Sequence, residues 1–221
     1  MPLINTQPYV TATSSGAAAH TRLLMHFDGV NNGVVFTDEC GNPQGSYANV
    51  KTSTAQSKFG GSSLRCDVGA VIMPTPTIGI NDFTIEMWIM FDSMTGTQIF
   101  YDQRFGNGGN GAAPCIFWNG SAVTWWFNGS ARFIGGTIAP NVWAHVAMSR
   151  TNNILRGFVN GVAVGSSSEP AASSNDTSIA IAGYSLRPTA YPFKGYIDEL
   201  RVCHDGLYTG NFTPPSAPFT L

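Results

Sequence analysis

Apolar and polar positions alternate along most of the chain in short runs, which is the period of a half-buried β-strand. Val, Ile, Phe, Trp and Thr dominate these runs, and Gly, Asn and Pro separate them at the spacing typical of an antiparallel sandwich. Helical periodicity is nearly absent, with at most a turn or two near 53–58 or 205–208. The pattern predicts strands over 23–27, 63–67, 83–91, 98–101, 115–118, 123–127, 131–134, 142–150, 155–159, 162–164, 178–182 and 195–203.

Two of these runs, 83–91 and 142–150, are largely apolar on both faces. We therefore expect both to be central strands. Period two places His145 and Val146 on opposite faces of the second strand. In the first strand Glu86 stands among apolar neighbours, so a buried Glu86 would need a hydrogen-bond donor or a raised pKa.

Three Asn-Gly pairs stand between apolar runs, at 119–120, 128–129 and 160–161. A type I′ turn needs a positive φ at both central residues, and Asn-Gly supplies this readily. The region from 115 to 165 is therefore predicted to be a meander of hairpins.

The two ends of the chain differ from the middle. Residues 1–20 have no sustained apolar period, which predicts an extended N-terminal arm, either disordered or ordered against a neighbouring subunit. Residues 206–221 are rich in Pro and predict an extended tail laid over the sandwich. Residues 21–205 form the sandwich itself, and a 221-residue chain of this class is routinely one domain.

The composition of the chain argues against binding to nucleic acids or membranes. Charged residues are 11% of the chain, against roughly 25% in typical soluble proteins, and the formal net charge is −2. Without a cluster of Lys and Arg the chain lacks the charge that binds nucleic acid or anionic membranes. No apolar run reaches the roughly 18 residues of a membrane span, and the first residues do not resemble an export signal, so we expect synthesis in a host cytoplasm without membrane insertion.

Four cysteines, Cys40, Cys66, Cys115 and Cys203, are widely spaced and form no Cys-x-x-Cys pair. A chain of this length folds without covalent staples, so the spacing favours reduced thiols in the core. One or two disulfides, or a metal site, remain as alternatives.

Six short motifs follow one another along the chain: LLMHFDG at 23–29, SKFGGSS at 57–63, DFTIEMW at 82–88, WAHVA at 143–147, VNG at 159–161 and GYIDELR at 195–201. In this order they resemble the laminin G-like members of the concanavalin A-like lectin/glucanase superfamily, over about 22–215. The resemblance implies a two-sheet antiparallel jelly roll, with the first and last strands adjacent.

The ending LYTGNFTPPSAPF at 207–219 is similar to the close of such domains in tailed-phage structural and tail-fibre proteins. This resemblance implies a non-enzymatic bacteriophage virion protein, either a capsid decoration or a tail component. Its partners would then be other virion proteins and further copies of itself as a homo-oligomer. The expected location is the virion.

Catalysis is not expected. Glucanases of the superfamily present Glu-x-Asp-x-x-Glu on one strand face, and that motif is absent here. Glu86 stands alone, and the adjacent Asp198 and Glu199 are expected on opposite faces of a strand. Glycoside hydrolysis needs a pair of carboxylates flanking one bond, so we predict no enzyme.

No cofactor is required by this sequence, but calcium is an open alternative. Many relatives in the family hold a calcium ion near a sandwich edge, which would implicate Asp28, Asp38 and Asp198 as ligands here. The structural alternative is that Asp28 serves an ordinary turn before Gly29 and that Asp198 accepts a backbone hydrogen bond.

Trp125 and Trp126 are adjacent in one predicted strand and must point to opposite faces, so one of them is expected outside the core. An outer Trp could stack on a sugar, which makes a lectin module that binds a host glycan the alternative function. It could equally be covered by a loop, an arm or a partner subunit. The other candidates for this contact surface are Tyr101, Arg104, Trp118 and Arg132.

Overall fold

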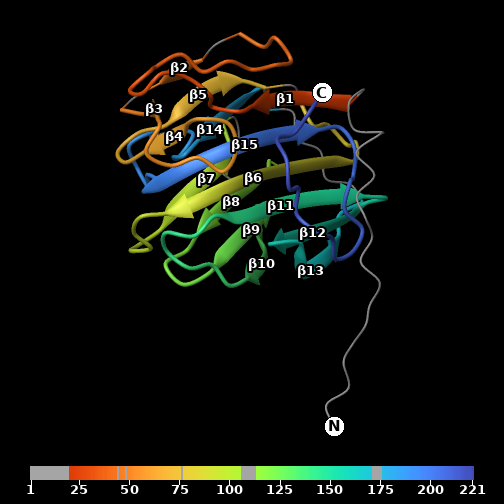
Figure 1. Cartoon of the computed structure of the whole chain (residues 1–221). Coiled ribbons are helices and arrows are strands. Elements are labelled where there is room, and N and C mark those ends of the chain that lie inside the picture. Colours follow the sequence, from red (N-terminus) through yellow and green to blue (C-terminus); the bar gives the residue numbers. More distant parts are fainter. Residues whose placement is uncertain (1–19, 44, 48, 76, 106–112, 171–175) are drawn as a thin grey trace.

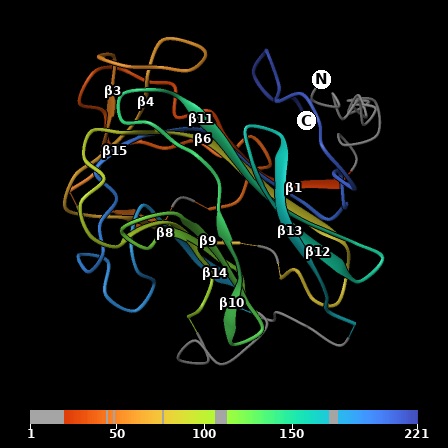
Figure 2. The same cartoon turned by 90° about the horizontal axis from the view of Figure 1, so that it is seen from below.

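A computed structural model describes residues 20–43, 45–47, 49–75, 77–105, 113–170 and 176–221. Two antiparallel sheets are stacked face to face in this part of the chain, as Figures 1 and 2 show from two directions. The predicted all-β sandwich is confirmed. The arm expected at 1–20 lies outside the described residues except for His20.

The larger sheet, here called sheet A, has the order β13-β12-β11-β6-β15-β4-β3, and β1 also pairs with β15. Pairing of β1 with β15 places the first and last strands of the sandwich side by side, as the family resemblance implies. The strands of sheet A are β1 (Thr21–Met25), β3 (Lys51–Ser53), β4 (Ser63–Cys66), β6 (Phe83–Phe91), β11 (Ala144–Thr151), β12 (Ile154–Val159), β13 (Val162–Ser168) and β15 (Gly195–Cys203).

The second sheet, sheet B, has the order β10-β9-β8-β7-β14-β5-β2. Strands β7 to β10 run next to one another in the order of the chain. The single meander predicted over 115–165 is wrong in one respect: its first three strands, β8 to β10, lie in sheet B, and its last three, β11 to β13, lie in sheet A. Turn residues predict hairpins but do not reveal where the chain crosses from one sheet to the other. The strands of sheet B are β2 (Ser46–Tyr47), β5 (Val71–Pro74), β7 (Gln98–Asp102), β8 (Cys115–Trp118), β9 (Val123–Phe127), β10 (Ser130–Gly135) and β14 (Ser178–Ile181).

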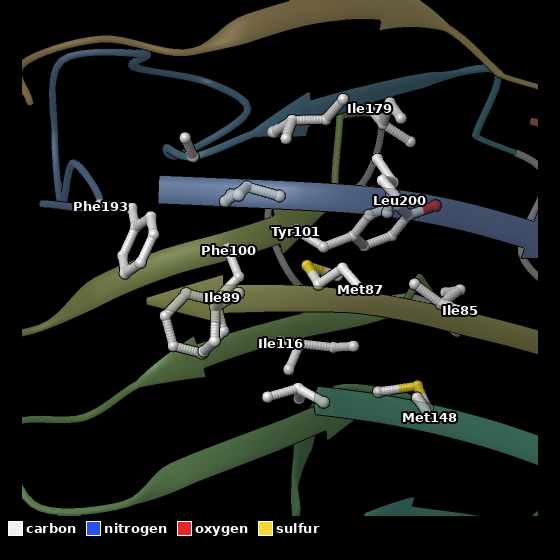
Figure 3. Close-up of a cluster of buried hydrophobic side chains, with 14 of the residues drawn as sticks. Ile85, Met87, Ile89, Phe100, Tyr101, Ile116, Met148, Ile179, Phe193 and Leu200 are labelled. Atoms are coloured by element: carbon white, nitrogen blue, oxygen red, sulfur yellow. The ribbon is translucent and has the colours of Figure 1, made fainter. Parts of the chain in front are cut away.

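The core fills the space between the sheets. Ile85, Met87 and Ile89 project inward from β6 and meet Phe100 and Ile116 from sheet B (Figure 3). All nine residues of β6 and all nine of β15 are buried, because both faces of these central strands are covered. The prediction that the 83–91 and 142–150 runs are central strands is confirmed.

The Trp125 side chain spans the core from one sheet to the other. Trp125 projects from β9 and donates its Nε1 hydrogen to the carbonyl oxygen of Ala147 in the opposite sheet, at 2.8 Å. A Cβ atom on Gly157 would lie 2.6 Å from the Trp125 ring, so only glycine fits at that position of β12.

Two of the three type I′ turns predicted at Asn-Gly pairs are confirmed. Asn128-Gly129 (φ 49° and 79°) and Asn160-Gly161 (φ 50° and 75°) have the two positive φ angles of the predicted turn. Asn119-Gly120 does not, because only Gly120 has a positive φ, and the Asn119 side chain instead accepts backbone hydrogen bonds from 121 and 122. A further turn of this kind, Asn152-Asn153 (φ 50° and 63°), lacks the glycine that would have made it recognisable.

All four cysteines are free thiols, and Cys66, Cys115 and Cys203 are buried. The expectation of reduced core thiols is confirmed. Burial raises the pKa of these buried thiols, so they behave as small apolar side chains.

Residues 204–221, here called the C-terminal segment, lie across the outer face of sheet A (dark blue in Figure 1). Its backbone N–H groups hold it at several points, and Leu207 N donates to the Thr84 side-chain Oγ1 at 2.9 Å. Phe212 N donates to the carbonyl oxygen of Gly161 at 2.9 Å. The Pro-rich segment therefore forms part of the packed structure.

A helix with the length and apolar character of a membrane span is not found in the part of the chain that the structure describes.

Candidate functional site

An open groove of about 280 Å³ lies against three neighbouring strands of sheet B and the segment 183–193. We call it the aromatic groove, because four of its seven lining side chains are aromatic. Its lining residues are Thr97, Ile99, Arg104, Phe117, Trp126, Tyr184 and Tyr191.

Strand alternation explains the floor of the groove. Ile99 of β7 is paired with Phe117 of β8, and Trp126 lies on the next strand, β9. The neighbours of these residues, among them Ile116 and Trp125, point into the core. Since successive side chains of a strand face opposite ways, Ile99, Phe117 and Trp126 present one apolar surface to the outside.

The wall of the groove is built by the segment between β14 and β15. Tyr184 and Tyr191 project from it with ring centroids 6.2 Å apart and an interplanar angle of 61°. Ile99 N donates to the carbonyl oxygen of Tyr191 at 3.0 Å, which fixes the segment to β7. Tyr191 has φ 54° and its side chain is 52% exposed. A bulky residue held in the left-handed region is strained, and such strain gathers at binding sites.

Arg104 supplies the charged group of the lining. Its Nε and Nη2 donate to the two carboxylate oxygens of Asp102, at 2.7 and 3.1 Å, in a bidentate ion pair. Its guanidinium carbon lies 5.6 Å from the Trp126 ring centroid and 5.5 Å from that of Tyr184. These contacts hold the guanidinium between the two rings at the edge of the groove.

The groove combines flat apolar rings with a small number of placed donors. Trp126 Nε1 is buried and has no hydrogen-bond partner among the described residues. Trp88 Nε1 on sheet A is in the same state, so the unpaired nitrogen does not by itself mark a ligand site, and the accessible donor of the groove is the guanidinium of Arg104. Asp102, the carboxylate beside the groove, already accepts four hydrogen bonds from Arg104 and Ser185. The arrangement therefore suits binding rather than proton transfer.

The structure separates the contact residues that the sequence suggested. Trp126 lies on the outside and Trp125 in the core, as their adjacency required, and Arg104 lines the groove. Trp118 and Tyr101 are core residues instead, with Trp118 Nε1 bonded to the carbonyl oxygen of Met94 and the Tyr101 hydroxyl bonded to Gln103. Periodicity could not exclude these two, because flanking β-bulges and loops decide which face is covered.

Arg132 is also placed elsewhere. It lies on β10 and forms an ion pair with Glu169 at 2.8 Å, while donating to the carbonyl oxygens of Phe127 and Asn128. This side chain closes the end of a hairpin and does not line the aromatic groove.

Sequence reasoning missed Tyr184 and Tyr191, which form the wall. A signal existed, because the segment GYSLRPTAYP at 183–192 carries two tyrosines among turn-forming residues, where apolar burial within a strand is not expected. What the sequence could not show is that this segment folds back onto β7.

Two of the three acidic residues considered for calcium lie near one loop. Asp28 Oδ1 accepts from Gly61 N at 3.1 Å, and Asp198 Oδ2 accepts from Lys58 N at 2.7 Å. Asp198 Oδ1 is buried without a hydrogen-bond partner among the described residues. Burial raises the pKa of Asp198 to about 7 against the backbone hydrogen bonds, and the carboxylates of Glu199 and Asp28 add to the rise.

Asp38 is used differently. Its carboxylate accepts hydrogen bonds from the backbone of Leu24 at 2.8 Å, Cys40 at 3.2 Å and Asn42 at 3.0 Å, which ties the following loop to β1. Within the described ranges, no three His, Cys, Asp or Glu side chains are grouped to hold a metal ion. Asp28, Asp38 and Asp198 are thus not brought together as one ligand set, and the buried Asp198 oxygen is the atom that would suit a cation.

The expected opposition of Asp198 and Glu199 is wrong. A β-bulge in β15 shifts the register between Asp198 and Arg201, with Glu199 at φ 54°. Ile197 and Leu200 both point into the core, so the two acids between them lie on the outer face of sheet A. Glu199 accepts from His26 Nδ1 and from the backbone of Phe219, both at 2.8 Å.

Glu86 lies on the same outer face and has the donors that its burial demands. Arg201 Nε donates to it at 2.9 Å, the Tyr208 hydroxyl at 2.7 Å, and His145 Nε2 lies 3.1 Å away. Burial alone would raise the pKa of Glu86, but Arg201, with His145 and Tyr208, lowers it to about 2. The hydrogen-bond alternative is confirmed, and the raised pKa is not.

Family comparison agrees with this architecture. A sequence model described as the concanavalin A-like lectin/glucanases superfamily matches residues 67–208, which is more than half of the chain. The chain belongs to this superfamily. Among curated proteins, none matches the chain.

Solved structures with a similar fold include domain 4 of AbnA, a GH43 extracellular arabinanase from Geobacillus stearothermophilus, in complex with arabinotriose. That domain is 18% identical, with a TM-score of 0.59, over 86% of this chain and 95% of the other.

Two toxin structures are similar as well. The binding domain of Paraclostridial Mosquitocidal Protein 1 has a TM-score of 0.64 at 14% identity, over 86% of this chain and 50% of the other. The binding domain of botulinum neurotoxin serotype D has a TM-score of 0.63 at 12% identity, over 87% and 50%. The chain thus spans about half the length of each toxin binding domain, and the likeness concerns the fold.

Proposed function

We propose that this chain is a non-catalytic carbohydrate-binding domain whose ligand lies in the aromatic groove. One observation carries the proposal: the rings of Trp126, Tyr184 and Tyr191 line an open groove beside the fixed guanidinium of Arg104. The C–H faces of sugar rings pack against aromatic rings, and sugar hydroxyls accept hydrogen bonds from placed donors. At about 280 Å³ the groove is near the lower limit of ligand pockets, roughly 300 Å³, and suits about one or two sugar rings.

The state of the acidic residues supports a domain without catalysis. Glu86 and Glu199 are both buried under the C-terminal segment and both accept hydrogen bonds from the chain itself. Glycoside hydrolysis requires one carboxyl group that protonates the leaving oxygen and another that attacks or activates water. A carboxylate covered by protein and held by donors performs neither role.

The printed description of the arabinanase domain, a complex with arabinotriose, also supports sugar binding. Such similarity concerns the fold, so the argument for this chain rests on the groove.

The first test is a glycan array followed by calorimetry with the purified chain. We expect binding of one or more oligosaccharides, and Trp126→Ala should weaken it by at least about tenfold, because the largest stacking ring is lost. Trp143→Ala is the matched control, since Trp143 is also partly exposed but lies outside the groove lining. It should leave the affinity unchanged. Silence on the array, or equal loss in both variants, would overturn the proposal.

The setting that we propose for this domain is a bacteriophage virion, where it would assemble with other virion proteins and with further copies of itself. The resemblance of residues 207–219 to the ends of tailed-phage domains supports this location. Mass spectrometry of purified particles tests it: stoichiometric presence of the chain is expected, and its absence would contradict the virion setting without affecting sugar binding.

Calcium binding is a separate proposal, supported by the unpaired Oδ1 of Asp198 and by the nearby Asp28. Thermal unfolding with calcium and with a chelator tests it. Calcium should raise the melting temperature of the native chain but not that of Asp198→Asn. Equal melting temperatures for the native chain in both buffers would contradict calcium binding.

A further inference from the structure

The charge of the aromatic groove is balanced within the protein. Of the seven lining side chains, Arg104 is the one that carries a charge. It forms the bidentate ion pair with Asp102, whose side chain is 0% exposed. Because the guanidinium and the carboxylate are in direct contact, the pair adds almost no net charge to the site.

The carboxylate of Asp102 is held firmly. Besides the two guanidinium contacts, it accepts Arg104 N at 3.1 Å and Ser185 N at 3.1 Å. The second bond ties the end of β7 to the segment that carries Tyr184. An anionic ligand would have to displace this carboxylate or sit beside it, and either arrangement is unfavourable.

Arg104 nevertheless keeps hydrogen-bonding capacity. A guanidinium has five N–H groups, and Asp102 takes two of them. The remaining ones lie at the groove edge, between the rings of Trp126 and Tyr184. They can donate to sugar hydroxyls or to a ring oxygen, neither of which needs a countercharge.

We propose that the aromatic groove selects uncharged oligosaccharides and discriminates against acidic ones, through the neutral Arg104–Asp102 pair. The inference rests on the proposed function, because it concerns the ligand of the same groove. Arg187 is a cation of the segment 183–193 that could oppose this selectivity, but its side chain is exposed and lies outside the lining. Solvent and salt screen such a charge.

The experiment compares neutral trisaccharides with the same trisaccharides oxidised at C6 to carboxylates, by calorimetry at about 50 and about 500 mM salt. In each pair one ring carries a CH2OH group in the neutral member and a carboxylate in the oxidised member, and the rest of the trisaccharide is the same. We expect the neutral member to bind at least about tenfold more tightly, with an affinity that salt does not change. Tighter or equal binding of the oxidised member would overturn the inference and leave sugar binding intact. Binding of neither would overturn both.

Asp102→Asn sharpens the test, because it removes the negative charge and keeps the shape. The uncompensated Arg104 should then improve binding of the oxidised trisaccharide by roughly fivefold and make it sensitive to salt. Arg187→Gln is the control and should change neither preference. Circular dichroism establishes that both variants fold; if Asp102→Asn does not, the comparison of trisaccharide pairs on the native chain still decides the inference.

Discussion

The outer faces of the two sheets carry similar side chains but differ in what lies over them. On sheet A, Glu86 and Trp88 are covered by other segments of the same chain and are buried. On sheet B, Trp126 and Tyr191 border an open groove. Aromatic and charged residues on the outer face of a sheet are therefore either buried or left open to solvent, depending on whether another segment of the chain covers them.

Hydrogen bonding at the charged groups shows what coverage does. The carboxylate of Glu86 has three partners in Arg201, Tyr208 and His145, and the C-terminal segment provides one of them. The indole Nε1 atoms of Trp88 and Trp126 are both buried without a partner among the described residues, so this atom does not distinguish the two faces. The faces differ in what covers them: chain segments lie over Glu86 and Trp88, whereas Trp126 borders the open groove.

The largest effect should come from breaking the charge network on sheet A. Glu86→Gln leaves Arg201 partly buried without its countercharge and should lower the free energy of unfolding by about 3–5 kcal/mol at pH 7. Urea denaturation measures it. The folded pKa of about 2 lies below the ordinary 4.5, so this stabilisation is present above pH 4.5 and is lost as the pH falls toward 2. A loss that does not shrink in acid would contradict this assignment.

The two outward tryptophans test the comparison directly. Trp88 is buried, with Lys58 Nζ 3.9 Å from its ring centroid and the His145 ring at 5.2 Å. Trp88→Ala should lower the free energy of unfolding by about 3 kcal/mol. Trp126→Ala, on the open face, should lower it by less than about 1 kcal/mol. Equal losses in urea denaturation would mean that the two faces do not differ as described.

Tyr208→Phe tests how the C-terminal segment is fastened. The change removes the hydroxyl that donates to Glu86 at 2.7 Å but keeps the ring stacked on Phe212, with centroids 3.6 Å apart. We expect a loss of about 2 kcal/mol in the free energy of unfolding, since the acceptor is charged. Tyr191→Phe, on the exposed side of the groove, is the control and should stay within about 0.5 kcal/mol.

The last effect is the pH dependence that Asp198 gives to stability. Its pKa is raised from 3.8 to about 7, so the folded chain binds this proton more tightly than the unfolded chain does. Stability therefore falls as the pH rises from about 4 to about 7. In buffer with a chelator, Asp198→Asn should be more stable than the native chain at pH 8 and equally stable at pH 4, because asparagine is neutral at both. Thermal unfolding across this range checks it, and a gain that is constant with pH would disprove the explanation.

The fold could be predicted because strand periodicity is a local property. The alternation in 83–91 and 144–148 follows directly from the pleat, and the core positions Ile85, Met87 and Val146 lie where period two places them. The site was predictable only in part. Adjacency required one of Trp125 and Trp126 to face outward, but no local pattern stated which other residues would lie beside it.

A single extra residue in β15 made the prediction for Asp198 and Glu199 wrong. The β-bulge in β15 turned Glu199 to the same face as Asp198, which strict alternation excludes. Bulges depend on how two strands match along their whole length, so a short window of sequence does not reveal them.

The sequence by itself determined an antiparallel sandwich of one superfamily, its central strands and its weakly charged character, because side-chain periodicity and composition act locally. Tertiary structure decided which outward faces became covered. The C-terminal segment buries the charged network of sheet A, and the segment 183–193 brings Tyr184 and Tyr191 to Trp126. Both outcomes depend on contacts between residues far apart in the chain, which periodicity does not encode.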